Sequence, residues 1–117
     1  MQRLKKRADF LRAARGARAV TPSLTLETCA SPDGATDLRV GFTASRKIGG
    51  AVERNRAKRR LRAAAAAVLP LSGRPGNDYV LVARPGALTR PYLNLREDLA
   101  AAIASAHLKL ASTKGRS

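Results

Sequence analysis

The chain has 117 residues, of which 23 are Lys or Arg and 8 are Asp or Glu, so its formal net charge is +15. This length fits a single domain over residues 1–117, and an apolar content of 44% supports a packed core and argues against wholesale disorder. The single cysteine and single histidine exclude a disulfide framework and argue against a Cys- or His-based metal site, and no apolar run approaches the roughly 18 residues of a membrane span.

The N-terminal part of the chain predicts one helix followed by two strands. The helix covers residues 8–15, where apolar side chains recur on one side, and Gly16 is a natural stop. Apolar and polar residues alternate over residues 24–29 and again over 38–45, as in half-buried strands. Turn-forming residues at 31–34 predict that these two strands form a hairpin.

The rest of the chain predicts two longer helices and a third strand. A Gly49-Gly50 pair leads into a helix over residues 51–69, which Pro70 ends. An almost continuous apolar run at 78–83 predicts a strand, and residues 84–86 turn the chain. A final helix covers 92–110, and the tail 111–117 is expected to fray.

One face of the predicted helix 51–69 forms a narrow apolar stripe that should face the core. Its members have 4-3-4 spacing: Ala57, Leu61, Ala64 and Val68. The element order α-β-β-α-β-α predicts the α/β class, a single-domain two-layer sandwich with helices packed on a small central sheet.

The positive charge is concentrated in two segments. Residues 1–18 hold seven bases and one acid, and residues 39–62 hold nine bases and one acid, so that these two segments carry +14 of the +15. Arginines scattered for solubility would not cluster in this way. The distribution indicates a polyanion-binding surface, with nucleic acid as the first candidate and an acidic membrane as the second.

The basic, alanine-rich N-terminus is similar in composition to a targeting segment. Arg12, Arg15 and Arg18 interrupt the apolar core that a signal peptide needs. An Arg-rich start is also compatible with a mitochondrial address, but a cytoplasmic location is the preferred prediction.

The segment 39–62 joins a strand, a two-glycine turn and a helix that begins with basic residues. A helix N-terminus already favours phosphate through its unpaired N–H groups and partial positive charge. Arg and Lys there oppose the helix dipole, which a protein tolerates where an anion binds. Arg offers planar bidentate donors, and Asn55 hydrogen-bonds in both directions. Glu53 is the only acid in the segment, whereas a solvated helix face would mix Glu with Arg. The segment therefore predicts nucleic-acid binding.

The sequence contains no catalytic constellation. No carboxylates have a spacing that suggests acid–base catalysis, and no phosphate-binding loop follows Gly49-Gly50. His107, near the end of an apolar helix, is interpreted as a capping or surface residue, and Cys29 as a small hydrophobic residue.

The basic segment resembles the signature of the bacterial ribonuclease P protein component. The residues that carry the resemblance are Ser45-Arg46-Lys47-Ile48-Gly49, Ala51-Val52, Arg54-Asn55-Arg56, and Lys58-Arg59 through Arg62. Residues 7–16, with Arg7, Asp9, Phe10 and Gly16, are similar to the family's first helix, and residues 78–84 are similar to its later strand. The resemblance covers about residues 3–108.

The resemblance implies an α/β fold with a four-stranded sheet and an unusual left-handed βαβ crossover around the Arg-Asn-Arg helix, against the usual handedness. Three strands are evident from the residues, and the fourth is expected near Ile48 or Leu71.

The resemblance also implies a division of labour in removal of the 5′ leader from precursor tRNA. The RNA subunit is the catalyst and uses Mg2+ to hydrolyse the phosphodiester, so the protein has no catalytic residue and no metal site, and needs neither a membrane nor an obligate protein partner. Binding to the ribonuclease P RNA is expected from Arg46, Lys47, Arg54, Asn55, Arg56, Lys58, Arg59, Arg60 and Arg62. Binding to the single-stranded leader, in a cleft between the first helix and the sheet, is expected from Phe10, Arg39, Thr43, Ser45 and Arg84.

Two departures from the family pattern bear on the leader. Ala14 stands where a second aromatic is common, and the first strand has Leu24, Leu26 and Glu27 instead of an aromatic. Leader contacts would then depend more on Phe10, charge and backbone, although Phe10 is equally well explained as a buried contact between helix and sheet. Arg46 replaces the commoner Lys, which should strengthen phosphate binding.

Three other functions compete with this interpretation. A small basic ribosomal or RNA-chaperone protein would share the charge but would not require Arg-Asn-Arg after a Gly-Gly turn. A self-sufficient nuclease would need carboxylate or His clusters. A membrane-surface protein would need a broad, bulky apolar helix face.

Overall fold

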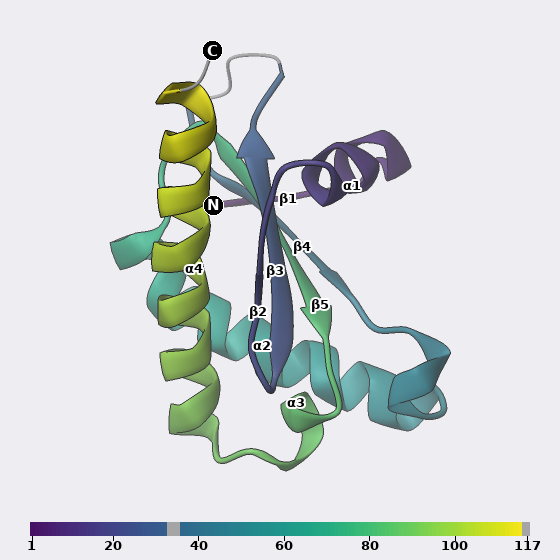
Figure 1. Ribbon diagram of the computed structural model, residues 1–117. Coiled ribbons are helices and arrows are strands. Elements are labelled where there is room, and N and C mark those ends of the chain that lie inside the picture. The colour runs from purple at the N-terminus through teal and green to yellow at the C-terminus, as the bar shows by residue number, and fades with distance from the viewer. Residues whose placement is uncertain (33–35, 116–117) are drawn as a thin grey trace.

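The computed structural model describes residues 1–32 and 36–115, with side chains described as far as residue 111. A central sheet has the helix α1 (Arg7–Ala14) on one face, while α2 (Ala51–Ser72) and α4 (Tyr92–Gly115) cover the other face (Figure 1). The mixed α/β class is therefore confirmed. Within the described residues, no helix is both long enough and apolar enough to cross a membrane.

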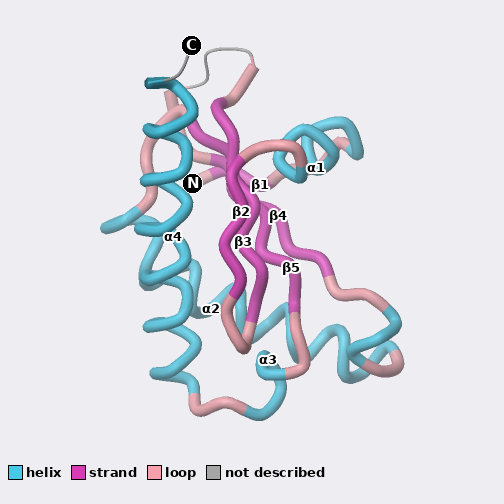
Figure 2. The backbone as a smooth tube through the Cα atoms, viewed as in Figure 1, coloured by secondary structure: helices cyan, strands magenta, loops and turns pink. Residues whose placement is uncertain are grey.

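The sheet has five strands (Figure 2), in the spatial order β1-β4-β5-β3-β2. The strands are β1 (Gln2–Arg3), β2 (Ala17–Val20), β3 (Leu24–Ala30), β4 (Arg39–Thr43) and β5 (Asn77–Ala83). β4 is parallel to β1 and β5, whereas β3 is antiparallel to β5 and β2. α2 connects the neighbouring parallel strands β4 and β5, and the left hand of that crossover stays a prediction.

The predicted hairpin between the strands at 24–29 and 38–45 is wrong. β5 lies between β3 and β4 and pairs with both. Its residues from Asp78 to Leu81 are all buried, which explains the almost continuous apolar run and gives β5 the central position. The chain does form a hairpin, between β2 and β3 across residues 21–23.

The expected fourth strand near Ile48 or Leu71 is also wrong. Ile48 ends a 3-10 helix, η1 (Arg46–Ile48), and Leu71 lies in the last turn of α2. The additional strands are β1 and β2, two short edge strands whose sequences lack β-branched or aromatic runs.

The predicted helices are present, but two of them extend farther. α2 continues through Pro70 to Ser72, and α4 reaches Gly115, into the tail that was expected to fray. Proline removes the bond to the carbonyl of Ala66, which lies on an exposed turn where water can bind it. A short helix, α3 (Gly86–Thr89), follows β5 where a turn was predicted. The predicted turn residues 33 and 34 lie outside the described residues.

The core between the sheet and α2 and α4 is aliphatic and rich in alanine. The predicted stripe of α2 is buried there: Ala57, Leu61, Ala64 and Val68. Leu95, Leu99 and Ile103 pack against it from α4.

His107 is buried in this core and does not have the predicted capping or surface position. Its Nε2 lies 2.8 Å from the Tyr79 hydroxyl, which also accepts a hydrogen bond from the backbone N–H of Arg74 at 2.8 Å. Because the Tyr79 oxygen accepts from Arg74, its own proton is available to His107 Nε2. The contact thus favours a neutral imidazole.

Mildly acidic pH is expected to lower the free energy of unfolding, because His107 is held neutral in the fold. Burial, and then the charge of Arg74, lower the pKa of His107 below its usual value of 6.5. Below that value the unfolded chain binds a proton that the folded chain does not, so the free energy of unfolding should fall as pH drops through 6.5 toward the lower folded pKa. Urea unfolding from pH 7.5 to 5 measures this effect. His107→Gln should flatten the profile in this window, and an unchanged slope in that variant would contradict the assignment to His107.

Candidate nucleic-acid interface

The connection from β4 to α2 sets the geometry of the basic segment. The Ser45 hydroxyl accepts a bond from the Lys47 N–H at 3.3 Å and begins η1. Gly49 has φ +144°, a conformation that L-residues rarely adopt, and a Cβ there would lie 2.9 Å from that of Glu53. The glycine turn therefore lets α2 begin directly after η1, with Glu53 in its first turn, where the helix dipole favours an acid.

Most of the predicted RNA-subunit residues lie exposed or half-exposed on η1 and the first three turns of α2. We call this surface the α2 basic face; it consists of Arg46, Lys47, Arg54, Asn55, Arg56, Lys58, Arg59 and Arg62. Asn55, Lys58, Arg59 and Arg62 line a shallow groove with the exposed Val52. A second hollow, lined by Ala44, Ala51, Arg54, Asn55 and Lys58, lies where α2 meets the end of β4. Closely spaced cations along such grooves can bind successive phosphates.

Arg60 does not belong to this face, although it was predicted with it. Its Nη1 donates to the Ala87 carbonyl at 2.7 Å and its Nη2 to the Arg90 carbonyl at 2.5 Å. These bonds attach α2 to α3 and to the start of α4. Arg60 is thus a structural anchor, because both of its terminal nitrogens are already engaged.

The opposite face of the sheet is where leader binding was predicted. Cross-strand partners share a face, and the pairs Thr43–Val82, Val82–Thr25 and Thr25–Val20 place these four side chains in one row. α1 covers the sheet on this side around Val80 and Cys29. The row from Thr43 to Val20 lies two residues from Val80 along β5 and four residues from Cys29 along β3. Burial raises the pKa of the Cys29 thiol, which makes it unreactive.

Arg39 was predicted to bind the leader, but its guanidinium is engaged within the fold. It forms a bidentate pair with Asp78, with Nε–Oδ1 and Nη2–Oδ2 distances of 2.8 Å. Asp78 is fully buried, and its Oδ1 also accepts from Ser31 at 2.6 Å. Asp9 of α1 lies 3.7 Å from Arg39 and pairs with Arg12 at 2.9 Å. Arg39 therefore links α1 to the sheet, and this geometry does not support a leader contact.

Phe10 packs on the sheet beneath α1. It is half-buried, and a Cβ on Gly41 would lie 2.5 Å from its Cε1 atom, so only glycine accommodates the ring at that point of β4. The ring also contacts the small cluster of Leu4, Ala13, Cys29 and Val80. The alternative prediction, a contact between helix and sheet, describes this position, and Gly41 precedes Thr43 by two residues on β4.

The other predicted leader residues lie at or near one end of the row from Thr43 to Val20. Thr43 is half-exposed at the end of β4, and Ser45 follows it at the start of η1. Arg84, just after β5, donates from Nη1 to the Thr21 carbonyl at 3.1 Å and remains exposed. Ser45 is therefore next to both surfaces, since the α2 basic face begins at Arg46.

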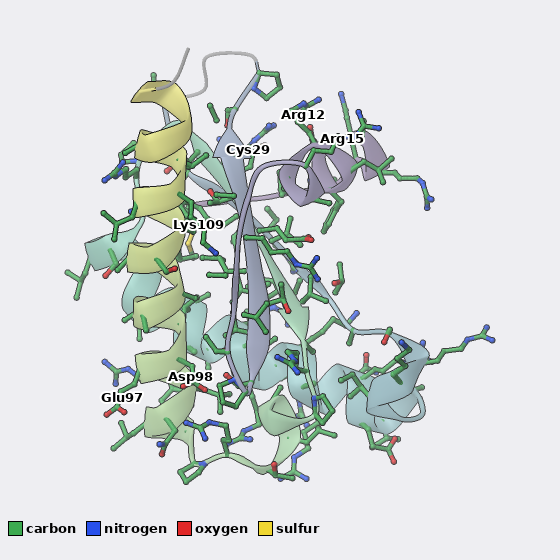
Figure 3. The ribbon with its side chains drawn as sticks, viewed as in Figure 1. Arg12, Arg15, Cys29, Glu97, Asp98 and Lys109 are labelled. Carbon is green, nitrogen blue, oxygen red and sulfur yellow. The ribbon has the colours of Figure 1, made fainter. Side chains whose placement is uncertain are left out.

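Sequence reasoning missed two further features of the surface. Arg15 and Arg18 line a hollow with Lys109 of α4, whose Nζ donates to the Arg18 carbonyl. Figure 3 shows Arg15 just after α1, near Arg12 of that helix. Tyr92, the first residue of α4, lines another hollow with Arg56 and Arg59. Neither could be found from spacing, because each joins segments that are distant in sequence.

Comparison with known proteins places this architecture in one family. The family model of ribonuclease P matches residues 1–107. The ribonuclease P protein component of Caulobacter vibrioides is 50% identical over 104 residues, which cover 89% of this chain and 70% of that protein. The corresponding protein of Ruegeria pomeroyi is 51% identical over 106 residues, with coverage of 89% and 85%.

Solved structures show the same fold. The Staphylococcus aureus RNase P protein has a TM-score of 0.74 at 27% identity, over 93% of this chain and 98% of that one. The RNase P protein from Thermotoga maritima has a TM-score of 0.71 over 94% and 96%, and at 23% identity it supports the fold alone.

Proposed function

Because this chain belongs to the ribonuclease P protein family, we propose that it binds a catalytic RNA subunit and assists removal of the 5′ leader from precursor tRNA. The observation that carries the proposal is the α2 basic face, where seven cations and Asn55 are gathered over η1 and three turns of one helix. In this proposal the face binds phosphates of the ribonuclease P RNA.

The second part of the proposal concerns the leader. The sheet face beside α1 carries the row from Thr43 to Val20, in which Val20 is exposed, Thr43 and Val82 are half-exposed and Thr25 is buried. Phe10 and Arg84 lie near this row. Extended single strands bind well to surfaces that combine polar groups, cations and an aromatic edge. Ser45 lies between the two faces, so a leader on the sheet would run toward RNA held by α2.

The chemical step is assigned to the RNA subunit. We propose that this RNA uses Mg2+ to hydrolyse the phosphodiester, while the protein contributes positive charge and positions the leader. Within the described residues, no three His, Cys, Asp or Glu side chains form a group that could hold a metal ion. The bacterial relatives support a cytoplasmic location, where precursor tRNA is made.

Reconstitution with the cognate ribonuclease P RNA tests the proposal. At a magnesium concentration where the RNA alone cleaves precursor tRNA poorly, addition of the protein should restore cleavage at the mature 5′ end. A charge-depleted variant of the α2 basic face, Arg54→Gln/Arg56→Gln/Arg59→Gln, is the matched control and should restore little. The protein without RNA should not cleave.

The rival functions predict different results. A ribosomal or RNA-chaperone protein would bind RNA without raising the rate of cleavage at that position. A self-sufficient nuclease would cleave without the RNA subunit. Either outcome would contradict the proposal.

A further inference from the structure

Tyr92 is the most exposed of the four aromatic residues. The chain has two Phe and two Tyr, and all four side chains lie in the described part of the structure. Tyr79 is fully buried, Phe10 packs on Gly41, and Phe42 packs against the core with Arg62 5.7 Å above its ring. Tyr92 is 37% exposed at the start of α4. Because this chain has so few aromatic residues, an exposed Tyr at this position indicates a role in binding.

The surroundings of this ring are strongly cationic. Tyr92 lines a hollow with Arg56, Arg59, Arg60 and Ala63 of α2, where the two helices meet. The Arg96 guanidinium lies 6.0 Å from the ring centroid, close enough for a cation–π contact. Arg56 and Arg59 are exposed and belong to the α2 basic face. The ring is therefore next to the phosphate-binding side chains but comes from a different helix.

The position of Tyr92 is fixed by contacts within the fold. Arg60 bonds to the carbonyls of Ala87 and Arg90 and thereby fixes the segment that precedes α4. Asp98 pairs with Arg90, with a 2.9 Å distance to Nε, and accepts from Ser23 at 2.8 Å. These contacts hold the start of α4 against both α2 and the β2–β3 turn. The backbone that carries Tyr92 is therefore held in place before any RNA binds.

We propose that Tyr92 stacks on an unpaired base of the ribonuclease P RNA, with Arg56 and Arg59 binding the adjoining phosphates. This inference rests on the proposed function and adds to the α2 basic face a base-binding position on α4. A purely electrostatic surface would need no aromatic ring, whereas an unpaired base presents a flat π-face that a Tyr ring matches without sequence preference. The cations around the hollow would neutralise the phosphates that flank the stacked base.

The test measures affinity of the full chain for its ribonuclease P RNA at several salt concentrations. Loss of one stacked base should raise the dissociation constant about 5- to 150-fold, so Tyr92→Ala should show an increase in this range. The slope of log affinity against log salt should not change, because no phosphate contact is removed. Tyr92→Phe keeps the ring and should bind like the unaltered protein. Leu93→Ala removes an adjacent apolar side chain that is 65% exposed and should also have no effect.

A second readout identifies the base. Chemical probing of unpaired nucleotides should show one site that the unaltered protein protects and that Tyr92→Ala leaves reactive, with the other protected sites retained. Circular dichroism and thermal unfolding of each variant check the fold, which Leu95 and Leu99 should maintain because they anchor α4 in the core.

The possible outcomes separate this inference from the proposed function. Arg56→Gln should weaken binding and reduce the salt slope if the α2 basic face binds RNA at all. If Arg56→Gln weakens binding but Tyr92→Ala does not, the stacking inference is wrong and the proposed function stands. If neither variant weakens binding, the proposed function itself is wrong. Equal losses for Tyr92→Phe and Tyr92→Ala would show that the hydroxyl matters instead of the ring, which also overturns the inference.

Discussion

Replacement of Asp78 by Ala is expected to lower the free energy of unfolding by about 3–5 kcal/mol, a large share of the stability of a small domain. Asp78 is fully buried and binds Arg39 through two hydrogen bonds of 2.8 Å. The substitution removes both of these bonds from the Arg39 guanidinium, which lies beneath α1 with Asp9 at 3.7 Å. Urea unfolding at neutral pH measures the loss.

A double substitution is the matched control for this prediction. Arg39→Met/Asp78→Leu removes both charges together and should recover much of the stability lost by Asp78→Ala, because the cost comes mainly from burying the Arg39 charge without the Asp78 carboxylate. If Asp78→Ala costs less than about 1 kcal/mol, a range typical of exposed ion pairs, the pair would be a surface contact and the description of α1 docking would be wrong.

The ion pair also has a consequence for the leader face. Asp9 of α1 approaches Arg39 from above the sheet, while Asp78 binds it from β5. The cluster therefore sets where α1 lies on the sheet, and with it the position of Phe10 near the row from Thr43 to Val20. Arg39 therefore bears on the proposed leader site through the position of α1 and Phe10.

The helices were predictable because their signals are local. The stripe of Ala57, Leu61, Ala64 and Val68 recurs at helical spacing, and all four residues are buried. Strand pairing depends on segments far apart in sequence, and the turn residues at 31–34 favoured a pairing that β5 prevents. The apolar run of β5 carried the missing signal, since a strand buried on both faces belongs at the centre of a sheet.

The candidate site was also only partly predictable from the sequence. The clustering of charge over residues 39–62 correctly located a basic surface on α2, because charge density is a property of the sequence. Which of these cations can still bind RNA depends on the contacts that each side chain makes in the folded chain. Arg39 and Arg60 have the same side chain as Arg56, but buried Asp78 and the carbonyls of Ala87 and Arg90 engage them. No spacing rule separates an anchoring Arg from an exposed one.

The affinity for the ribonuclease P RNA is expected to depend steeply on salt. Seven cations of the α2 basic face are candidates for phosphate contacts: Arg46, Lys47, Arg54, Arg56, Lys58, Arg59 and Arg62. Each contact contributes roughly −0.7 to −0.9 to the slope of log affinity against log salt, so a slope of about −5 or steeper is predicted. Between about 50 and 200 mM salt, such a slope lowers the affinity roughly a thousandfold. Filter binding or fluorescence titration over that range measures it.

Two variants of α2 distinguish phosphate contacts from structural ones. Arg56→Gln removes an exposed cation and should make the slope shallower by about 0.7–0.9 without changing thermal stability. Arg60→Gln removes the bonds to Ala87 and Arg90 and should lower stability by about 1.5–3 kcal/mol while leaving the slope unchanged. A total slope shallower than about −2 would correspond to only two or three phosphate contacts and would contradict a face-wide clamp. An unchanged slope for Arg56→Gln, together with a shallower one for Arg60→Gln, would mean that the phosphates lie on the α3 side of the helix instead.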